Sequence, residues 1–123
     1  MDIRKQQKIV VAALEDIKAR DIVVFNVSHL TSLFERVIIA SGESARQVKA
    51  LANNVTEQYK AAGGHVRSVE GAETGEWVLV DLGDVVVHCM HPAIRQYYNL
   101  EELWGQPKPR ARRPKTALRA ATT

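Results

Sequence analysis

The amino-acid sequence predicts a single α/β domain in which helices flank a mixed β-sheet. Its 123 residues suffice for one hydrophobic core and are too few for two well-formed ones. Stretches with helical spacing of apolar residues alternate with short β-branched stretches, as in α/β proteins. One helical stretch lies between two predicted strands, and two later strands are joined by a short turn. The first arrangement predicts parallel strands and the second an antiparallel hairpin, so we expect a mixed sheet.

The first part of the predicted domain contains one helix and two strands. Residues 2 to about 19 place apolar side chains at helical spacing between charged ones, which predicts an amphipathic helix. Residues 22–27 are β-branched and aromatic and predict a strand. A polar connection follows at residues 28–35, and the apolar string RVIIA at residues 36–40 predicts a second strand. The helix residues expected to face the core are Ile3, Ile9 or Val10, Ala13, Leu14 and Ile17.

A second helix and a third strand complete a predicted crossover. The helix is expected from Ser44 or Ala45 to about Ala62, where Gly63-Gly64 stops it. The strand at residues 65–70 follows directly. A unit of this kind connects parallel strands of one sheet, with a right-handed connection. The helix residues predicted to share one apolar face are Val48, Leu51, Ala52, Val55 and Tyr59.

Two further strands, at residues 76–82 (EWVLVDL) and 85–90 (VVVHCM), form the predicted hairpin. Gly83-Asp84 between them suits a two-residue turn because glycine accepts a positive φ. Alternation along the strands then gives two faces. One face is wholly apolar and suits the core: Val78, Val80, Leu82, Val85, Val87 and Cys89. The other face consists of Trp77, Leu79, Asp81, Val86, His88 and Met90.

These faces depend on the register of the hairpin. The two-residue turn pairs Asp81 with Val86 and Leu79 with His88, whereas a three-residue loop would pair Asp81 with Val85 and mix the faces. With the first register, the second face has the composition of a protein contact surface, because tryptophan, methionine and a few partnered polar groups are typical there. Trp77 would be its exposed anchor. The alternative is that helices also cover this face.

The C-terminal part of the chain divides into a helix and a basic tail. Pro92 suits the first turn of a final helix, from which Ile94, Tyr97, Tyr98 and Leu103 are expected to pack. The ordered domain is predicted at residues 1–104. Residues 105–123 lack apolar periodicity and contain three prolines, which predicts a disordered tail.

The charge of the chain is unevenly distributed. Eleven of the 17 Lys and Arg and all 14 Asp and Glu precede Gly105, so the predicted domain carries −3 and the tail carries +6. A basic tail on an acidic domain favours a partner that includes nucleic acid, with attraction arising from the tail. The alternative is a tail that only improves solubility.

Several classes of protein are disfavoured by the composition. No apolar run approaches the ~20 residues of a membrane span. The N-terminus MDIRKQQK is not followed by an apolar stretch of signal-peptide length, so we expect a cytoplasmic protein that does not interact with membranes. Cys89 is the single cysteine, and we expect it to be a small buried hydrophobe. The four histidines lack paired spacing, so neither a metal nor another cofactor is expected.

The segment SGES at residues 41–44 is the second candidate site. Small residues at the start of a helix leave N–H groups that can bind a phosphate. The alternative is an ordinary helix cap, with Ser44 as N-cap and Gln47 completing a capping box. A nucleotidyltransferase would also need converging carboxylates for magnesium, and Asp81 and Asp84 straddle the predicted turn. The sequence therefore disfavours an enzyme, although a nucleotidyltransferase-like, nucleotide-binding enzyme remains the alternative.

Three strings occur in order between about Asp21 and Trp104: DIVVFNVSHLTSLFERVIIASGESARQVKALANNV, VEGAETGEWVLVDLGDVVVH and RQYYNLEELW. Together they resemble the ribosomal silencing factor family, also known by its plant relative Iojap. The resemblance implies a five-stranded mixed sheet like a nucleotidyltransferase core without catalytic carboxylates. It implies binding to protein fourteen of the large ribosomal subunit, which blocks subunit joining and represses translation under nutrient limitation.

The resemblance also implies roles for individual residues. Trp77, Asp81 and His88 are implied as partner contacts, and the predicted hairpin face adds Leu79 and Met90. The closing string assigns Arg95, Tyr97, Tyr98 and Trp104 chiefly to packing, with Arg95 and Tyr98 also candidates for the interface.

Two features depart from the family pattern. Asn26 stands where many relatives have Asp, which disfavours a metal there, and the basic tail is not shared. Contact between this tail and ribosomal RNA, or a general role as an RNA-binding adaptor, stays open.

Overall fold

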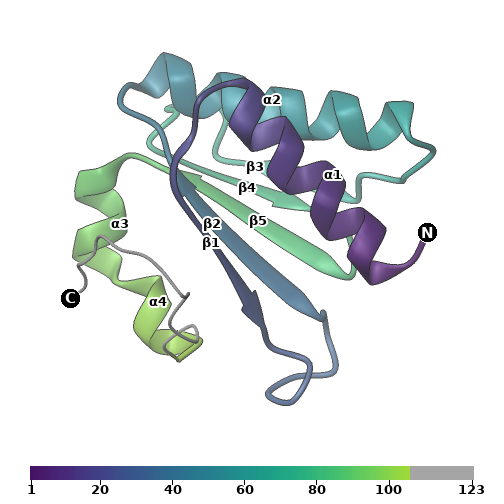
Figure 1. The fold of residues 1–123 in the computed structure, drawn as a ribbon. Coiled ribbons are helices and arrows are strands. Elements are labelled where there is room, and N and C mark those ends of the chain that lie inside the picture. Colours follow the sequence, from purple (N-terminus) through teal and green to yellow (C-terminus); the bar gives the residue numbers. More distant parts are fainter. Residues whose placement is uncertain (106–123) are drawn as a thin grey trace.

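A five-stranded sheet with the strand order β1-β2-β5-β4-β3 forms the centre of the fold (Figure 1). The computed structural model describes residues 1–105, so the predicted tail lies outside the described residues apart from Gly105. Neighbouring strands are antiparallel except β2 and β5, which are parallel, so the predicted mixed sheet is confirmed. The strands are β1 (Arg20–Asn26), β2 (Arg36–Ser41), β3 (Ser68–Glu70), β4 (Trp77–Asp81) and β5 (Val85–Met90).

Two long helices lie side by side on one face of the sheet, α1 (Ile3–Asp16) and α2 (Ala45–Ala61) (Figure 1). Asp2 caps α1 by accepting a hydrogen bond from the backbone N–H of Lys5 at 2.8 Å. The predicted end of α2 is confirmed, because Gly63 follows it with a φ of +92°. The main core lies between these helices and the sheet, and its largest helix residues are Val10, Leu14, Val48, Leu51, Val55 and Tyr59.

Two short helices cover part of the opposite face, α3 (Pro92–Tyr98) and α4 (Leu100–Leu103). The prediction of one final helix was wrong, because Asn99 takes a left-handed conformation with a φ of 50° and ends α3. Asparagine tolerates this conformation better than most residues. Under these helices lies a second apolar cluster, formed by Phe25, Val27, Val37, Ile39 and Met90.

The strand that follows α2 lies farther from β2 than a simple crossover would place it. β2 and β3 point the same way in one sheet, as predicted, but β5 and β4 lie between them. The apolar string of β5 takes the central place in the sheet, between β2 and β4. β3 contains only three residues and forms an edge of the sheet.

The predicted register of the hairpin is confirmed. Leu79 pairs with His88 and Asp81 with Val86, and Gly83 has a φ of +93°. The predicted core face is buried at all six positions. The opposite face of the hairpin therefore has a defined set of side chains.

Candidate functional site

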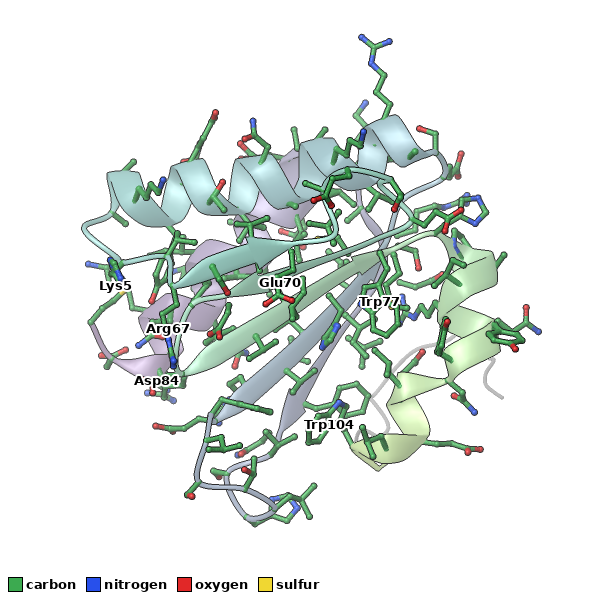
Figure 2. All side chains as sticks on the ribbon, turned by 180° about the vertical axis from the view of Figure 1, so that it is seen from behind. Lys5, Arg67, Glu70, Trp77, Asp84 and Trp104 are labelled. Atoms are coloured by element: carbon green, nitrogen blue, oxygen red, sulfur yellow. The ribbon has the colours of Figure 1, made fainter. Side chains whose placement is uncertain are left out.

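Part of the sheet surface opposite α1 and α2 is left uncovered by α3 and α4. We call it the open face and define it by Leu79, Asp81, Val86 and His88, all partly exposed, with Trp77 at its border. Glu70 of β3 pairs with Leu79, so its side chain lies on the same side of the sheet. Figure 2 shows Glu70 and Trp77 here and Trp104 below them. The open face thus combines apolar surface with carboxylates.

A hydrogen bond joins the two ring systems of the open face. The indole N–H of Trp77 donates to Nδ1 of His88 at 3.0 Å, and the ring centroids lie 5.9 Å apart. Because an indole N–H can only donate, Nδ1 must be unprotonated, which leaves the imidazole proton on Nε2. Burial lowers the pKa of His88 to about 4. His88 is therefore neutral at pH 7 and its ring is held in one orientation by Trp77.

Trp77 also contacts α3. Its ring centroid lies 5.0 Å from that of Tyr98, which is 54% exposed. Trp77 itself is partly buried and packs against the second apolar cluster. The expectation of a simply exposed anchor was therefore wrong, since Trp77 contributes to the core and to the surface together.

Asp81 has a structural role at the hairpin turn. Its Oδ1 accepts a hydrogen bond from the backbone N–H of Gly83 at 2.8 Å. Such a local bond stabilises the turn. The side chain nevertheless remains partly exposed on the open face.

Two predicted contact residues are placed inside the protein. Met90 is fully buried, because α3 and α4 cover this end of β5, so it supports the surface from beneath. Arg95 is 8% exposed, and its guanidinium donates to the carbonyl of Asp21 at 2.7 Å and to Oγ of Ser41 at 2.9 Å. It also pairs with Glu101 at 2.8 Å. The assignment of Arg95 to packing is thus confirmed, whereas the prediction of Met90 as a direct contact was wrong, and neither side chain is available to a partner.

Other apolar side chains around this side of the sheet were missed or placed wrongly. Leu30 and Leu33, 54% and 76% exposed, lie in the connection that we interpreted as polar. Tyr97 and Leu103 were expected to pack, yet they are 81% and 67% exposed. The connection between β1 and β2 meets the end of α4 where Phe34 contacts Trp104 edge to face, with ring centroids 5.6 Å apart. Two leucines in an interstrand connection were the sequence signal for this additional apolar surface.

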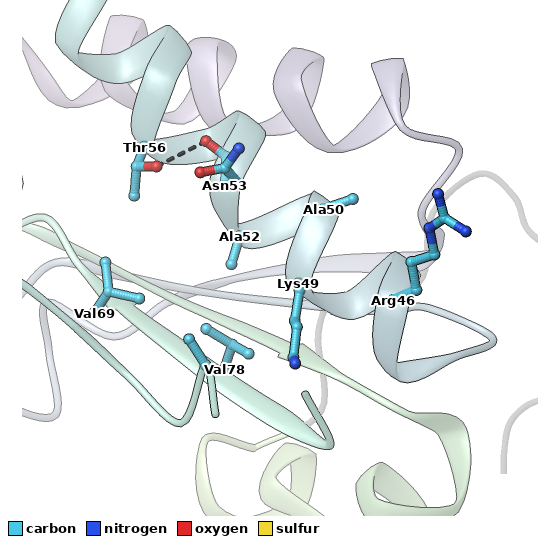
Figure 3. A pocket seen from close by; sticks show the side chains of 9 residues that line it. Arg46, Lys49, Ala50, Ala52, Asn53, Thr56, Val69 and Val78 are labelled. Carbon is cyan, nitrogen blue, oxygen red and sulfur yellow. Dashed lines mark hydrogen bonds between the residues drawn. The ribbon is translucent and has the colours of Figure 1, made fainter. Parts of the chain in front are cut away.

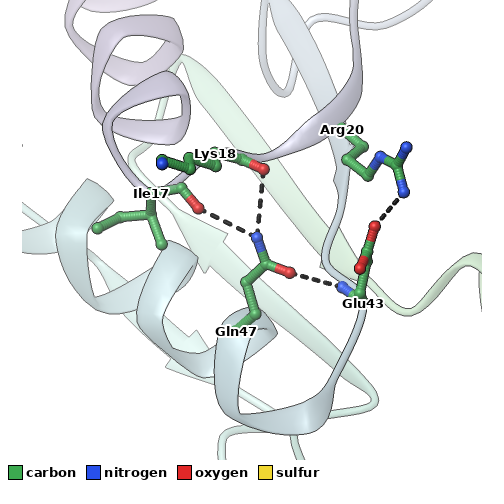
Figure 4. A network of polar contacts seen from close by, with 5 residues as sticks. All are labelled: Ile17, Lys18, Arg20, Glu43 and Gln47. Carbon is green, nitrogen blue, oxygen red and sulfur yellow. Dashed lines mark hydrogen bonds and ion pairs between the residues drawn. The ribbon is translucent and has the colours of Figure 1, made fainter.

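The SGES segment forms a helix cap, and the N–H groups of Gly42 and Glu43 have partners within the chain. Oγ of Ser44 accepts from the N–H of Gln47 at 3.1 Å. Oε1 of Gln47 accepts from the N–H of Glu43 at 2.7 Å (Figure 4). The N–H of Gly42 donates to the carbonyl of Met90 at 3.0 Å. The amide of Gln47 also donates to the carbonyl of Ile17, which ties the end of α1 to the start of α2. The capping interpretation is favoured over the phosphate site, because these donors are already engaged.

Residues 1–105 contain no cluster of three or more His, Cys, Asp or Glu that is arranged to hold a metal ion. Asn26 instead accepts two hydrogen bonds from Ser28. Cys89 is buried as predicted, and burial raises the pKa of its thiol to about 12. Within the same residues, no helix has the length and hydropathy needed to cross a bilayer.

The chain is similar to known proteins over most of its length. The family model described as "Ribosomal silencing factor during starvation" matches residues 1–123, which extends beyond the range on which the resemblance was recognised. A ribosomal silencing factor RsfS from Chromobacterium violaceum is 57% identical over 109 residues, 89% of this chain and 89% of that protein. The mouse protein named "Mitochondrial assembly of ribosomal large subunit protein 1" is 33% identical, over 76% of this chain and 42% of that protein.

Solved structures agree with the sequence comparisons. A crystal structure of a protein from Chromobacterium violaceum matches with a TM-score of 0.85 and 56% identity, covering 89% of this chain and 92% of that one. The fold, the family model and the identity to named members lead to the same assignment. The chain belongs to the ribosomal silencing factor family.

Proposed function

We propose that this protein binds protein fourteen of the large ribosomal subunit through its open face and thereby keeps the small subunit from joining. Translation would then be repressed when nutrients are short. The action is steric and requires no catalytic step or cofactor. It also places the protein in the cytoplasm, where ribosomes work.

The observation that carries the proposal is the uncovered apolar and acidic surface around Trp77. A partly buried aromatic ring with exposed neighbours is typical of a binding hot spot, because its packing holds it in place before the partner arrives. Trp77 is held by His88 and Tyr98 in this way. The name of the mouse relative ties that protein to assembly of the ribosomal large subunit, which supports the same subunit as partner here.

Charge supports a basic partner. Asp81 and Glu70 lie on the side of the open face, and residues 1–105 carry a net charge of −3. Ribosomal proteins are commonly basic because they contact RNA, so opposite charges would speed and orient association. The open face thus fits a ribosomal protein better than RNA itself.

The test is a sucrose gradient in which purified subunits are mixed with the full chain under joining conditions. Leu79→Glu places a carboxylate in the centre of the open face and should reduce binding to the large subunit at least ~30-fold, so that joined ribosomes form. Gln58→Glu adds the same charge on the solvent-exposed side of α2, and this variant should still block joining. If Leu79→Glu blocks joining as well as the unchanged chain does, the open face is not the binding surface.

A further inference from the structure

A groove lies on the opposite side of the sheet from the open face, between α2 and the edge strand β3. Its volume is about 460 Å³, and its surface is mainly apolar. The buried residues Ala52 and Val78 form the floor, and Val69 of β3 forms one wall (Figure 3). The remaining lining residues are Arg46, Lys49, Ala50, Asn53, Thr56 and Ala72.

The groove exists because α2 does not reach the edge of the sheet. α2 packs on β4 and β5, while β3 extends beyond it. Val69 pairs with Val80, so its side chain points to the helix-covered side of the sheet. Val80 is fully buried there, whereas Val69 is 43% exposed. A core-type position on β3 is therefore left without the helix that would cover it.

Two cationic side chains stand at one end of the groove. Arg46 and Lys49 are both exposed, and neither forms an ion pair within residues 1–105. Lys49 extends from α2 down toward Val78 (Figure 3). A Cβ at Gly75 would lie 2.8 Å from Cε of Lys49, so this glycine gives the lysine stem room to lie against the loop before β4. Among the residues that the structure describes, no acidic side chain lines the groove.

The free edge of β3 supplies a second kind of binding group. Within residues 1–105, β3 pairs only with β4, which leaves one row of its backbone N–H and C=O groups without a strand partner there. An added strand would satisfy these groups, and every second side chain of that strand would lie beside Val69, in the groove. Phosphate backbones need no apolar floor, so a peptide fits this arrangement better than a nucleic acid.

We propose that β3 and the groove bind an extended segment of a partner protein, with a small apolar side chain beside Val69 and an acidic side chain at Lys49 and Arg46. This docking surface is separate from the open face. The protein would then bind a second partner while its other side is occupied, and the proposal does not depend on the identity of the first partner.

The test begins with a displayed library of random ten-residue peptides selected on the full chain at 150 mM salt. We expect enriched peptides to alternate apolar residues and to contain Asp or Glu. A synthetic peptide of the selected sequence should shift the amide NMR signals of Val69 and of the Lys49–Asn53 turn, and leave those of Val86 and His88 on β5 unchanged. The double variant R46E/K49E should weaken its binding about tenfold, and a peptide with Lys in place of its acid should recover that loss.

Two controls separate the groove from general attraction. Lys60→Glu reverses one positive charge at the other end of α2, half the charge change of the double variant, and should leave peptide binding unchanged. N-methylation of every second peptide amide should abolish binding when the methylated amides are those that pair with β3. Methylation of the other set of amides should leave binding intact, as strand pairing requires. The proposal is overturned if selection yields no peptide that shifts these signals, if both methylated peptides bind equally, or if a ten-nucleotide single-stranded RNA displaces the peptide from the groove.

Discussion

Trp77 and His88 act as a unit, because each restricts the other. The indole N–H needs an acceptor, and the imidazole provides one only while it is neutral. Tyr98 of α3 packs against the ring of Trp77. At the scale of single residues, the open face is therefore sensitive both to pH and to the shape of one aromatic ring.

The pH dependence of stability should reveal His88. An unfolded histidine titrates near pH 6.5, while burial lowers the pKa of His88 to about 4. Between these values the unfolded chain binds a proton that the folded chain does not, so this contribution to stability is complete above pH ~6.5 and is lost as the pH falls. We expect urea unfolding to show that the stability difference between the wild type and His88→Gln shrinks by up to about 3 kcal/mol from pH 7 to pH 4.

The matched control is His65→Gln, because His65 is exposed. Its difference from the wild type should stay nearly constant over the same pH range. A constant difference for His88→Gln as well would show that His88 is not held neutral by burial.

Replacing Trp77 should reduce stability and binding together. Trp77→Ala removes packing against the second apolar cluster, and a partly buried aromatic should cost about 1–3 kcal/mol, less than full burial would. Binding to the large subunit should fall at least ~30-fold when measured well below the melting temperature. Trp77→Phe keeps much of the packing and loses the hydrogen bond, so its stability and its affinity should lie between those of the wild type and of Trp77→Ala. Wild-type affinity for Trp77→Ala would remove this residue from the interface.

At the scale of elements, α3 and α4 depend on their attachment to the sheet. α3 has seven residues and α4 has four, lengths at which isolated helices do not persist in water. Arg95 joins them to the strand ends through the carbonyl of Asp21 and the hydroxyl of Ser41. Asp21 has a φ of 52° and lies where the pairing of β1 with β2 is irregular, so Arg95 binds a carbonyl that this irregularity presents.

Arg95→Ala should loosen this attachment. It leaves the buried hydroxyl of Ser41 and the partly buried carbonyl of Asp21 without their donor and Glu101 without its partner, which should cost about 3 kcal/mol of unfolding free energy. Hydrogen exchange should accelerate in α3 and α4 more than in α2. Glu101→Gln, at a position that is partly exposed, should cost about 1 kcal/mol or less. Equal acceleration in all helices would show that Arg95 stabilises the whole fold rather than the attachment of α3.

At the scale of the whole molecule, charge is separated along the chain. Residues 1–105 carry −3 and the six Lys and Arg after them carry +6. The acidic part fits a basic ribosomal protein, and the basic part fits the RNA that surrounds such a protein. We extend the proposed function in this sense, with the two parts contacting different components of one subunit.

Deleting residues 106–123 should therefore weaken binding to the large subunit in a salt-dependent way. The loss should be greatest at low salt and small at high salt, because phosphate contacts release counterions. Binding is measured by co-sedimentation across a salt series, and circular dichroism checks that the shortened chain keeps its fold. A loss that is equal at all salt concentrations would contradict the electrostatic explanation.

The amino-acid sequence by itself determined the features that depend on near neighbours in the chain. Helical spacing identified the buried faces of α1 and α2, and Gly63 marked where α2 ends. Alternation around Gly83-Asp84 predicted the register of the hairpin that the structure confirms, and hence the composition of the open face. These features follow from side-chain period and turn chemistry, which act over a few residues.

Only the tertiary structure decided which of these faces remained uncovered. Met90 is buried and Leu79 is partly exposed, although both lie on one face of the hairpin, because α3 and α4 return over one end of β5 alone. Arg95 reaches Asp21 across 74 positions of the chain, and no local pattern encodes such a contact. The central place of β5 and the groove beside β3 likewise depend on how distant elements pack, since burial is a property of the assembled layers and not of any single segment.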